Sequence, residues 1–115
     1  MPSAPLVVRP YTRADFKACL RVFDSNLPQY FAESERAEFV DFLGAHPCEY
    51  LVVELNGALR ACGGSDVKDG IGRLCWGMVE QSHHRAALGS VLLVYRLNSL
   101  FSRALKLNPA VAAKR

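Results

Sequence analysis

Residues 71–97 read IGRLCWGMVEQSHHRAALGSVLLVYRL, and this stretch decides the fold. Its first nine residues, Ile71 to Val79, have the β-branched and aromatic composition of a strand. A short polar turn from Glu80 to Arg85 follows, and small residues then lead into an apolar helix. A strand that turns directly into a helix is typical of phosphate-binding sites, because the first helical N–H groups lack partners within the helix and the helix dipole adds positive potential.

The helix start has side chains that suit an anion. The small residues between Ala86 and Ser90 would let a pyrophosphate approach the backbone closely, and His84 and Arg85 stand where a cation would help. A second interpretation stays open at this point, because small residues also let a helix pack closely on a sheet and a single glycine-containing turn is weak evidence.

The run from His84 to Gly89, HRAALG, resembles the coenzyme A motif Q/R-x-x-G-x-G/A of the GNAT superfamily of N-acetyltransferases. His84 stands at the Gln/Arg position and Ala87 at the first glycine, whereas Gly89 matches the second. Met78 and Val79 lie at the right distance before the motif and resemble the end of that family's fourth strand. The resemblance implies that the chain binds acetyl-CoA through Met78, Val79, His84, Arg85, Ala86, Ala87, Leu88, Gly89 and Ser90.

The first part of the chain predicts one strand and two helices. Residues 6–9 are a short β-branched run, and Thr12 with Asp15 three residues later predicts a capped helix start. Apolar residues then recur at three- and four-residue steps, as in an amphipathic helix. A second helix is expected from Ser34 to Leu43, with Gly44 as its C-terminal stop.

The middle of the chain predicts a meander of strands. Residues 50–55 form a strand, and Asn56-Gly57 is the dipeptide most typical of a two-residue hairpin turn. The return strand is expected over residues 58–64, and a polar loop over residues 65–70 leads into the strand described above. A short fifth strand or a frayed tail is expected over Ala104–Asn108.

The order β-α-α-β-β-β-α-(β) predicts an α/β (α+β) fold in which a mixed, mostly antiparallel sheet is flanked by helices. This order matches the first two thirds of the GNAT fold over residues 6–108, and we expect one GNAT-like domain over residues 1–115. Members of that family continue with a further helix, a tyrosine that acts as the general acid, and two strands. The sequence therefore predicts a C-terminally short domain. Tyr95 is expected to pack in the core, and the uncovered sheet edge predicts a homodimer.

Composition excludes several classes of protein. The net charge of +3 suits an anionic cofactor but is too small and dispersed to predict nucleic-acid binding. The four cysteines have no CxxC spacing, which predicts free thiols in a reducing compartment and no metal site. The first ten residues lack a signal-peptide pattern, and the longest apolar run, Val91–Tyr95, is too short to cross a membrane. We therefore expect a cytoplasmic protein that binds neither membrane nor nucleic acid.

Acetyl transfer from a thioester to an amine needs a polarised carbonyl oxygen and a group that takes the proton of the amine. The resemblance implies that a backbone N–H at Met78 or Val79 polarises the carbonyl. Glu80 is the predicted catalytic proton acceptor and Glu54 the second candidate, while a solvated surface carboxylate is the alternative interpretation of each. The histidines at 83 and 84 are further titratable groups in the same turn.

The amine would bind beside the first two helices, by analogy with the family. Asn26, Tyr30 and Phe31 are the predicted substrate-binding residues, and a capped turn with core aromatics is the alternative. The sequence thus predicts an N-acetyltransferase that moves an acetyl group from acetyl-CoA to a primary amine of a small molecule or a protein. The alternative is a degenerate, non-catalytic domain that binds acyl-CoA or another protein.

Overall fold

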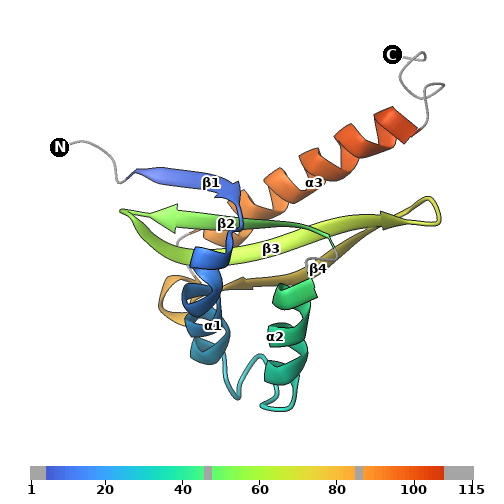
Figure 1. Cartoon of the computed structure of the whole chain (residues 1–115). Helices are drawn as coiled ribbons and strands as arrows, with labels where there is room; N and C mark the ends of the chain where they lie inside the picture. The colour runs from blue at the N-terminus through green and yellow to red at the C-terminus, as the bar shows by residue number, and fades with distance from the viewer. Residues whose placement is uncertain (1–4, 46–47, 85–86, 108–115) are drawn as a thin grey trace.

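The structure, a computed structural model, describes residues 5–45, 48–84 and 87–107, with side chains described up to Arg103. The predicted order of elements, β-α-α-β-β-β-α, is confirmed up to the last helix (Figure 1). The elements are β1 (Leu6–Pro10), η1 (Arg13–Asp15), α1 (Phe16–Ser25), α2 (Glu35–Ala45), β2 (Glu49–Leu55), β3 (Ala58–Lys68), β4 (Ile71–Val79), η2 (Gln81–His83) and α3 (Leu88–Leu107).

The described strands form one antiparallel sheet in the order β1-β2-β3-β4. Two tight hairpins produce this meander. Asn56 and Gly57 have φ of 56° and 79°, and Asp69 and Gly70 have φ of 54° and 77°, the positive values that a type I′ turn needs. Because consecutive strands are neighbours, β4 lies at the outer edge of the described sheet.

Helices cover both faces of the sheet, and the alternation of side chains along β2 shows how. Tyr50 and Val52 pack with the buried side chains of α1 and α2, whereas Leu51 and Val53 pack with Leu88 and Leu92 of α3. Figure 1 shows the same arrangement, with α1 and α2 on one side of the strands and α3 on the other. The continuous apolar run in β2 therefore reflects burial on both faces.

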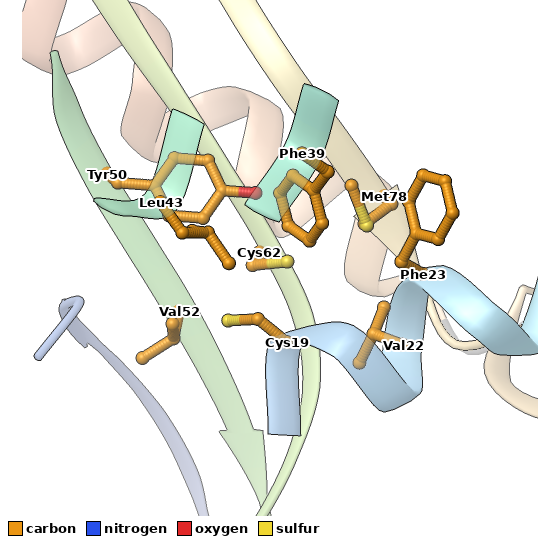
Figure 2. Packing of buried hydrophobic residues seen from close by; sticks show 9 residues of the cluster. All are labelled: Cys19, Val22, Phe23, Phe39, Leu43, Tyr50, Val52, Cys62 and Met78. Atoms are coloured by element: carbon orange, nitrogen blue, oxygen red, sulfur yellow. The ribbon is translucent and has the colours of Figure 1, made fainter. Parts of the chain in front are cut away.

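The larger core lies between the sheet and the first two helices (Figure 2). Its centre is aromatic: the ring centroid of Phe23 lies 4.8 Å from that of Phe31 and 5.4 Å from that of Phe39, in stacked geometry. Trp76 of β4 contacts the same cluster, with its ring 5.2 Å from that of Phe39. Aromatic pairs at these distances each add about 1 kcal/mol beyond the burial of their area, so this cluster fixes how β4 sits against α1 and α2.

A β-bulge interrupts β4 next to this cluster. The pairing of β3 with β4 shifts between Cys62 and Gly64, so that Trp76 and Gly77 together stand opposite Gly63, and Trp76 has a positive φ of 45°. The Tyr50 hydroxyl donates a hydrogen bond of 2.7 Å to the Trp76 carbonyl oxygen. Burial raises the pKa of Tyr50, which keeps the hydroxyl protonated as a donor and holds the bulge in place.

The boundaries predicted for the second helix and the return strand were wrong in part. Helix α2 continues through Gly44 to Ala45, so Gly44 is not its stop. Strand β3 continues to Lys68, because residues 65–68 pair with residues 71–74 instead of forming a loop. The Asp66 and Arg73 side chains form an ion pair of 2.7 Å across the two strands, a cross-strand pair that the polar composition concealed.

The end of the described chain also differs from the prediction. Helix α3 runs from Leu88 to Leu107, so residues 104–107 are helical and the predicted fifth strand is wrong there; Asn108 lies outside the described residues. Tyr95 is 49% exposed instead of packing in the core. The buried positions of α3 recur at Leu88, Leu92 and Arg96, and Tyr95 falls off this face of the helix.

Candidate active site at the open edge of β4

The backbone of Val79 faces the open edge of the sheet. The Glu80 N–H donates to the Arg60 carbonyl of β3 at 2.7 Å. In an antiparallel pair of strands, hydrogen-bonded and non-hydrogen-bonded residue pairs alternate. The next pair, Val79 with Ala61, is therefore non-hydrogen-bonded, and its backbone N–H and C=O groups point away from the partner strand. The Val79 carbonyl confirms this direction, because it accepts hydrogen bonds from Asn26 and His84 rather than from β3. The Val79 N–H therefore points to the same open side, just after the bulge.

The turn into α3 leaves backbone donors exposed. The first hydrogen bond of the helix runs from the Val91 N–H to the Ala87 carbonyl at 3.2 Å, so the N–H groups of Leu88, Gly89 and Ser90 precede it and lack partners within the helix. Ala87 has a φ of 63°, which favours glycine, and it stands where the motif has its first glycine. Arg85 and Ala86 lie outside the described residues.

Gly89 separates the two interpretations of the small residues. A Cβ built on Gly89 would meet no atom closer than Val79 Cγ2 at 3.8 Å, which is ordinary contact. The residue is also exposed. The helix could therefore pack on the sheet with a larger side chain here, and the requirement for close packing does not explain the glycine.

Two hollows flank the C-terminal half of β4 and share its residues. The first, of about 450 Å³, lies on the side of α3 and is lined by Gly77, Met78, Val79, His84, Gly89, Leu92 and Arg96. The second, of about 300 Å³, lies on the side of α1 and is lined by Asn26, Tyr30, Phe31, Gly77, Met78, Val79 and His84. Together they are large enough for part of a small-molecule ligand and leave β4 between them.

The structure brings Asn26 and His84 together from positions 58 residues apart. Asn26 is 2% exposed, and its amide Nδ2 donates to the Val22 and Val79 carbonyls at 2.9 and 3.0 Å. Its Oδ1 therefore faces His84 Nε2 at 2.9 Å, and the Val79 carbonyl lies 2.9 Å from the same nitrogen. Both neighbours of Nε2 are acceptors, so Nε2 carries a hydrogen, and the neutral ring has its lone pair on Nδ1.

The two predicted aromatic residues line the second hollow in different ways. Tyr30 is 55% exposed and meets the His84 ring edge-on, with centroids 4.9 Å apart. Phe31 is half-buried and stacks on Phe23, so it belongs to the core and to the wall of the hollow at once. The predicted substrate-binding set of Asn26, Tyr30 and Phe31 thus lies in one place.

The predicted proton acceptor Glu80 lies elsewhere. Its carboxylate forms an ion pair with Arg60 and lines a separate hollow with Arg9, Glu54 and Arg60. Glu54 is held by Arg9 at 2.6 Å in the same place. Neither carboxylate lines the two hollows beside β4, so the geometry does not bring them to the other site residues.

Sequence reasoning missed Arg96, which lines the first hollow although it sits in the apolar stripe of α3. Arg96 lies four residues after Leu92, on the face of the helix that is buried. A charged residue on a buried helix face is rare, so this spacing could have marked Arg96 as a candidate functional residue.

Two further findings concern metal ligands and helix length in residues 5–45, 48–84 and 87–107. In this part of the chain no group of three or more His, Cys, Asp or Glu residues could hold a metal ion. Nor does any helix here have the length and apolar character needed to cross a membrane.

The sequence matches no protein-family model and no curated protein at a significant level. The structure, however, is similar to a GNAT family acetyltransferase from Brucella melitensis in complex with acetyl-CoA, with a TM-score of 0.69 and 18% identity over 86% of this chain and 70% of that chain. It is similar to the ribosomal-protein-S18-alanine N-acetyltransferase of Escherichia coli, with a TM-score of 0.71 and 17% identity over 86% of this chain and 61% of that chain.

An aminoglycoside 6′-N-acetyltransferase complexed with coenzyme A gives a TM-score of 0.67 and 18% identity over 84% of this chain and 56% of that chain. In these comparisons the chain spans between 56% and 70% of its neighbour's length. The element order, the antiparallel meander and the similarity to several acetyltransferases agree, and the chain has the fold of the GNAT N-acetyltransferases.

Proposed function

We propose that this chain binds acetyl-CoA along β4 and the start of α3 and transfers the acetyl group to a primary amine. One observation carries the proposal: Val79, whose N–H points outward, and Gly89, in the first turn of α3, line one hollow, and packing does not require the glycine. A thioester ligand with a pyrophosphate at one end and a carbonyl at the other matches these two sets of donors.

The predicted cofactor residues take distinct parts in this proposal. The N–H groups of residues 88–90 would hold the pyrophosphate, and Arg85 would add its charge. The Val79 N–H would donate to the thioester carbonyl oxygen, where negative charge develops during acyl transfer. Met78 and His84 line the hollow between these ends.

We assign the proton acceptor to His84 instead of Glu80. The Asn26 amide and the Val79 carbonyl hold the Nε2 hydrogen, and the Nδ1 lone pair is left to take a proton. His84, Gly77, Met78 and Val79 line both hollows, so an amine bound beside Tyr30 and Phe31 would meet the acetyl group at the open edge of β4. Acetyl-CoA supplies the acyl group as a thioester, whose C–S bond breaks as the C–N bond to the amine forms. The departing coenzyme A thiolate then takes up the proton that His84 received, and coenzyme A leaves as the thiol.

A test of this assignment follows release of the coenzyme A thiol with a panel of primary amines, including peptide N-termini. We expect His84→Gln to lower kcat/KM by about 100-fold, the usual contribution of a general base.

His83→Gln is the matched control, because His83 is adjacent and its Nδ1 contacts the Ser82 hydroxyl at 2.8 Å outside both hollows. Equal activity of the two variants would show that His84 is not the base. Turnover lost in both, with acetyl-CoA binding kept, would move the role to another group.

The alternative function is a non-catalytic domain that binds acyl-CoA or a protein partner. The exposed apolar side chains of α3, among them Val94, Leu97 and Phe101, favour an interaction surface. Acetyl-CoA binding without thiol release for any amine in the panel would support this alternative. The four cysteines are free in the structure, and for either function we propose a reducing, cytoplasmic location.

A further inference from the structure

Arg96 is a buried cation without an acidic partner among the described residues. The residue is 9% exposed, and its Nε donates to the Gly64 carbonyl at 3.0 Å, with Nη2 3.5 Å from the Cys75 carbonyl. No carboxylate in the described part of the chain lies within 4.0 Å of its guanidinium. Burial lowers the pKa of Arg96, yet an arginine stays charged in proteins, so neutral carbonyls stabilise the charge here.

Two glycines make room for this side chain. A Cβ on Gly77 would lie 2.4 Å from Arg96 Nη1, and a Cβ on Gly63 would lie 3.2 Å from Cζ. The guanidinium therefore lies flat against β3 and β4 at the bulge, where any other residue at position 77 would displace it. Leu92, one turn earlier on α3, also lies against Gly63, because a Cβ there would be 3.0 Å from Leu92 Cδ2.

The Nη1 atom of Arg96 reaches the hollow on the α3 side. Nη1 has no hydrogen-bond partner among the described residues. Every fully buried side-chain nitrogen or oxygen atom of these residues does have a partner, so an atom without one is not fully buried. Nη1 is thus accessible, and Arg96 and Gly77 both line this hollow. A buried charge that lacks a counterion is costly, and an anionic ligand would offset that cost.

The guanidinium of Arg96 lies beside Gly77 of β4, whereas the proposed pyrophosphate donors are the N–H groups in the first turn of α3. The backbone of Arg96 follows that of Gly89 by seven residues, about 10 Å along the helix. Gly77, against which Nη1 lies, precedes Val79 by two residues, about 7 Å along the strand. The guanidinium therefore lies beyond the place proposed for the thioester carbonyl, on the side where the acyl chain would extend.

We infer that the hollow on the α3 side is selective for a dicarboxylic acyl group, such as succinyl or malonyl, whose distal carboxylate binds Arg96. This inference rests on the proposed function, because it names the acyl donor of the same site. Val79 would hold the thioester carbonyl while Arg96 Nη1 and the distal carboxylate form a charge-assisted hydrogen bond.

The test is calorimetric titration of the full chain with coenzyme A, acetyl-CoA and succinyl-CoA. We expect the wild type to bind succinyl-CoA at least about tenfold more tightly than acetyl-CoA, the effect of one hydrogen bond to a charged group. Arg96→Met should remove this difference and leave the affinity for coenzyme A itself unchanged. Arg96→Lys keeps the positive charge but loses the paired N–H groups of the guanidinium, so it should keep part of the difference in affinity between succinyl-CoA and acetyl-CoA.

Gly77→Ala is a second variant that leaves Arg96 in the sequence but displaces its guanidinium, and it too should lose the preference for succinyl-CoA. It keeps the test available if Arg96→Met does not fold. Equal wild-type affinities for acetyl-CoA and succinyl-CoA would overturn the inference while leaving the proposed function intact. A wild-type chain that binds none of the three ligands would overturn both.

Discussion

At the residue scale, the site depends on backbone conformations that the side chains do not favour. Asn56 and Asp69 adopt positive φ in their hairpins readily, since both residue types tolerate the left-handed region. Trp76 and Ala87 also have positive φ, of 45° and 63°, and have no such tolerance. Trp76 directly precedes Gly77 and Ala87 lies two residues before Gly89, so the strained positions are next to glycines that line the hollow proposed for acyl-CoA.

Ala87→Gly should stabilise the protein by about 1 kcal/mol, because relief of the left-handed alanine outweighs the entropy lost by glycine. Urea denaturation measures this free energy of unfolding. Ala37→Gly is the matched control, since Ala37 lies within α2 and the same substitution there should destabilise by about 1 kcal/mol. Destabilisation by both substitutions would show that Ala87 is not strained.

The site could be predicted from sequence only where its members are close in the chain. The motif indicated residues 84–90 and the strand indicated residues 78 and 79, because both follow local patterns. The hydrogen bond between Asn26 and His84 depends on how the turn after α1 meets the turn after β4. Whether Glu80 faces the hollows depends on the direction of the backbone after the bulge, which no local pattern specifies.

At the element scale, the joint between β1 and α1 is held by a compact charge network. Arg9 binds Asp15 at 2.8 Å and Glu54 of β2 at 2.6 Å, and Asp15 accepts the Thr12 N–H at 2.8 Å as the capping box predicted. These bonds tie the first strand, the start of the first helix and the second strand together. The network is partly buried, with the Asp15 side chain 9% exposed.

This network predicts a loss of stability in acid. The hydrogen bond from Arg9 lowers the pKa of Asp15 from 3.8 to about 2. The folded state therefore binds this proton less readily than the unfolded state. The contribution of Asp15, about 2 kcal/mol, is full above about pH 4 and is lost as the pH falls toward about 2.

Asp15→Asn removes this titration, so the free-energy gap between wild type and variant should narrow by about 2 kcal/mol between about pH 5 and about pH 2. Denaturation at a series of pH values measures the gap. Asp41→Asn, an exposed carboxylate on α2, serves as the control and should show a nearly constant gap. A constant gap for Asp15→Asn as well would contradict the proposed role of Arg9.

Element boundaries were harder to predict than element types. The polar residues 65–70 suggested a loop, but cross-strand pairing of Asp66 with Arg73 makes most of them strand. Residues 104–107 lack the pattern of an amphipathic helix, yet they continue α3 because a helix already formed extends at little cost. In both cases neighbours outside the segment decide its structure.

At the scale of the whole molecule, α3 projects past the sheet (Figure 1) and leaves apolar side chains exposed. The exposed fractions of Val94, Leu97 and Phe101 are 53%, 49% and 57%, and Ile71 and Leu74 on β4 are also exposed. A homodimer therefore stays a prediction. Sedimentation of the purified chain tests it, and a strictly monomeric profile at high concentration would contradict it.

The overall fold was predictable because its signals are local and agree with one another. The Asn-Gly and Asp-Gly turns enforce an antiparallel meander, and a doubly buried β2 requires helices on both faces. The meeting of α3 with the open edge of β4 then follows from the short turn between them. That meeting is the basis of the central claim, that the start of α3 binds coenzyme A.

The most direct test is calorimetric titration with acetyl-CoA of the wild type, Gly89→Glu and Ser102→Glu. Gly89→Glu would place a carboxylate among the N–H groups of the first turn, where it should stabilise the helix but repel a pyrophosphate. Ser102→Glu adds the same charge to an exposed position far along α3. We predict at least about tenfold weaker binding for Gly89→Glu alone. Equal binding by all three proteins, or none by the folded wild type at millimolar ligand, would contradict the claim.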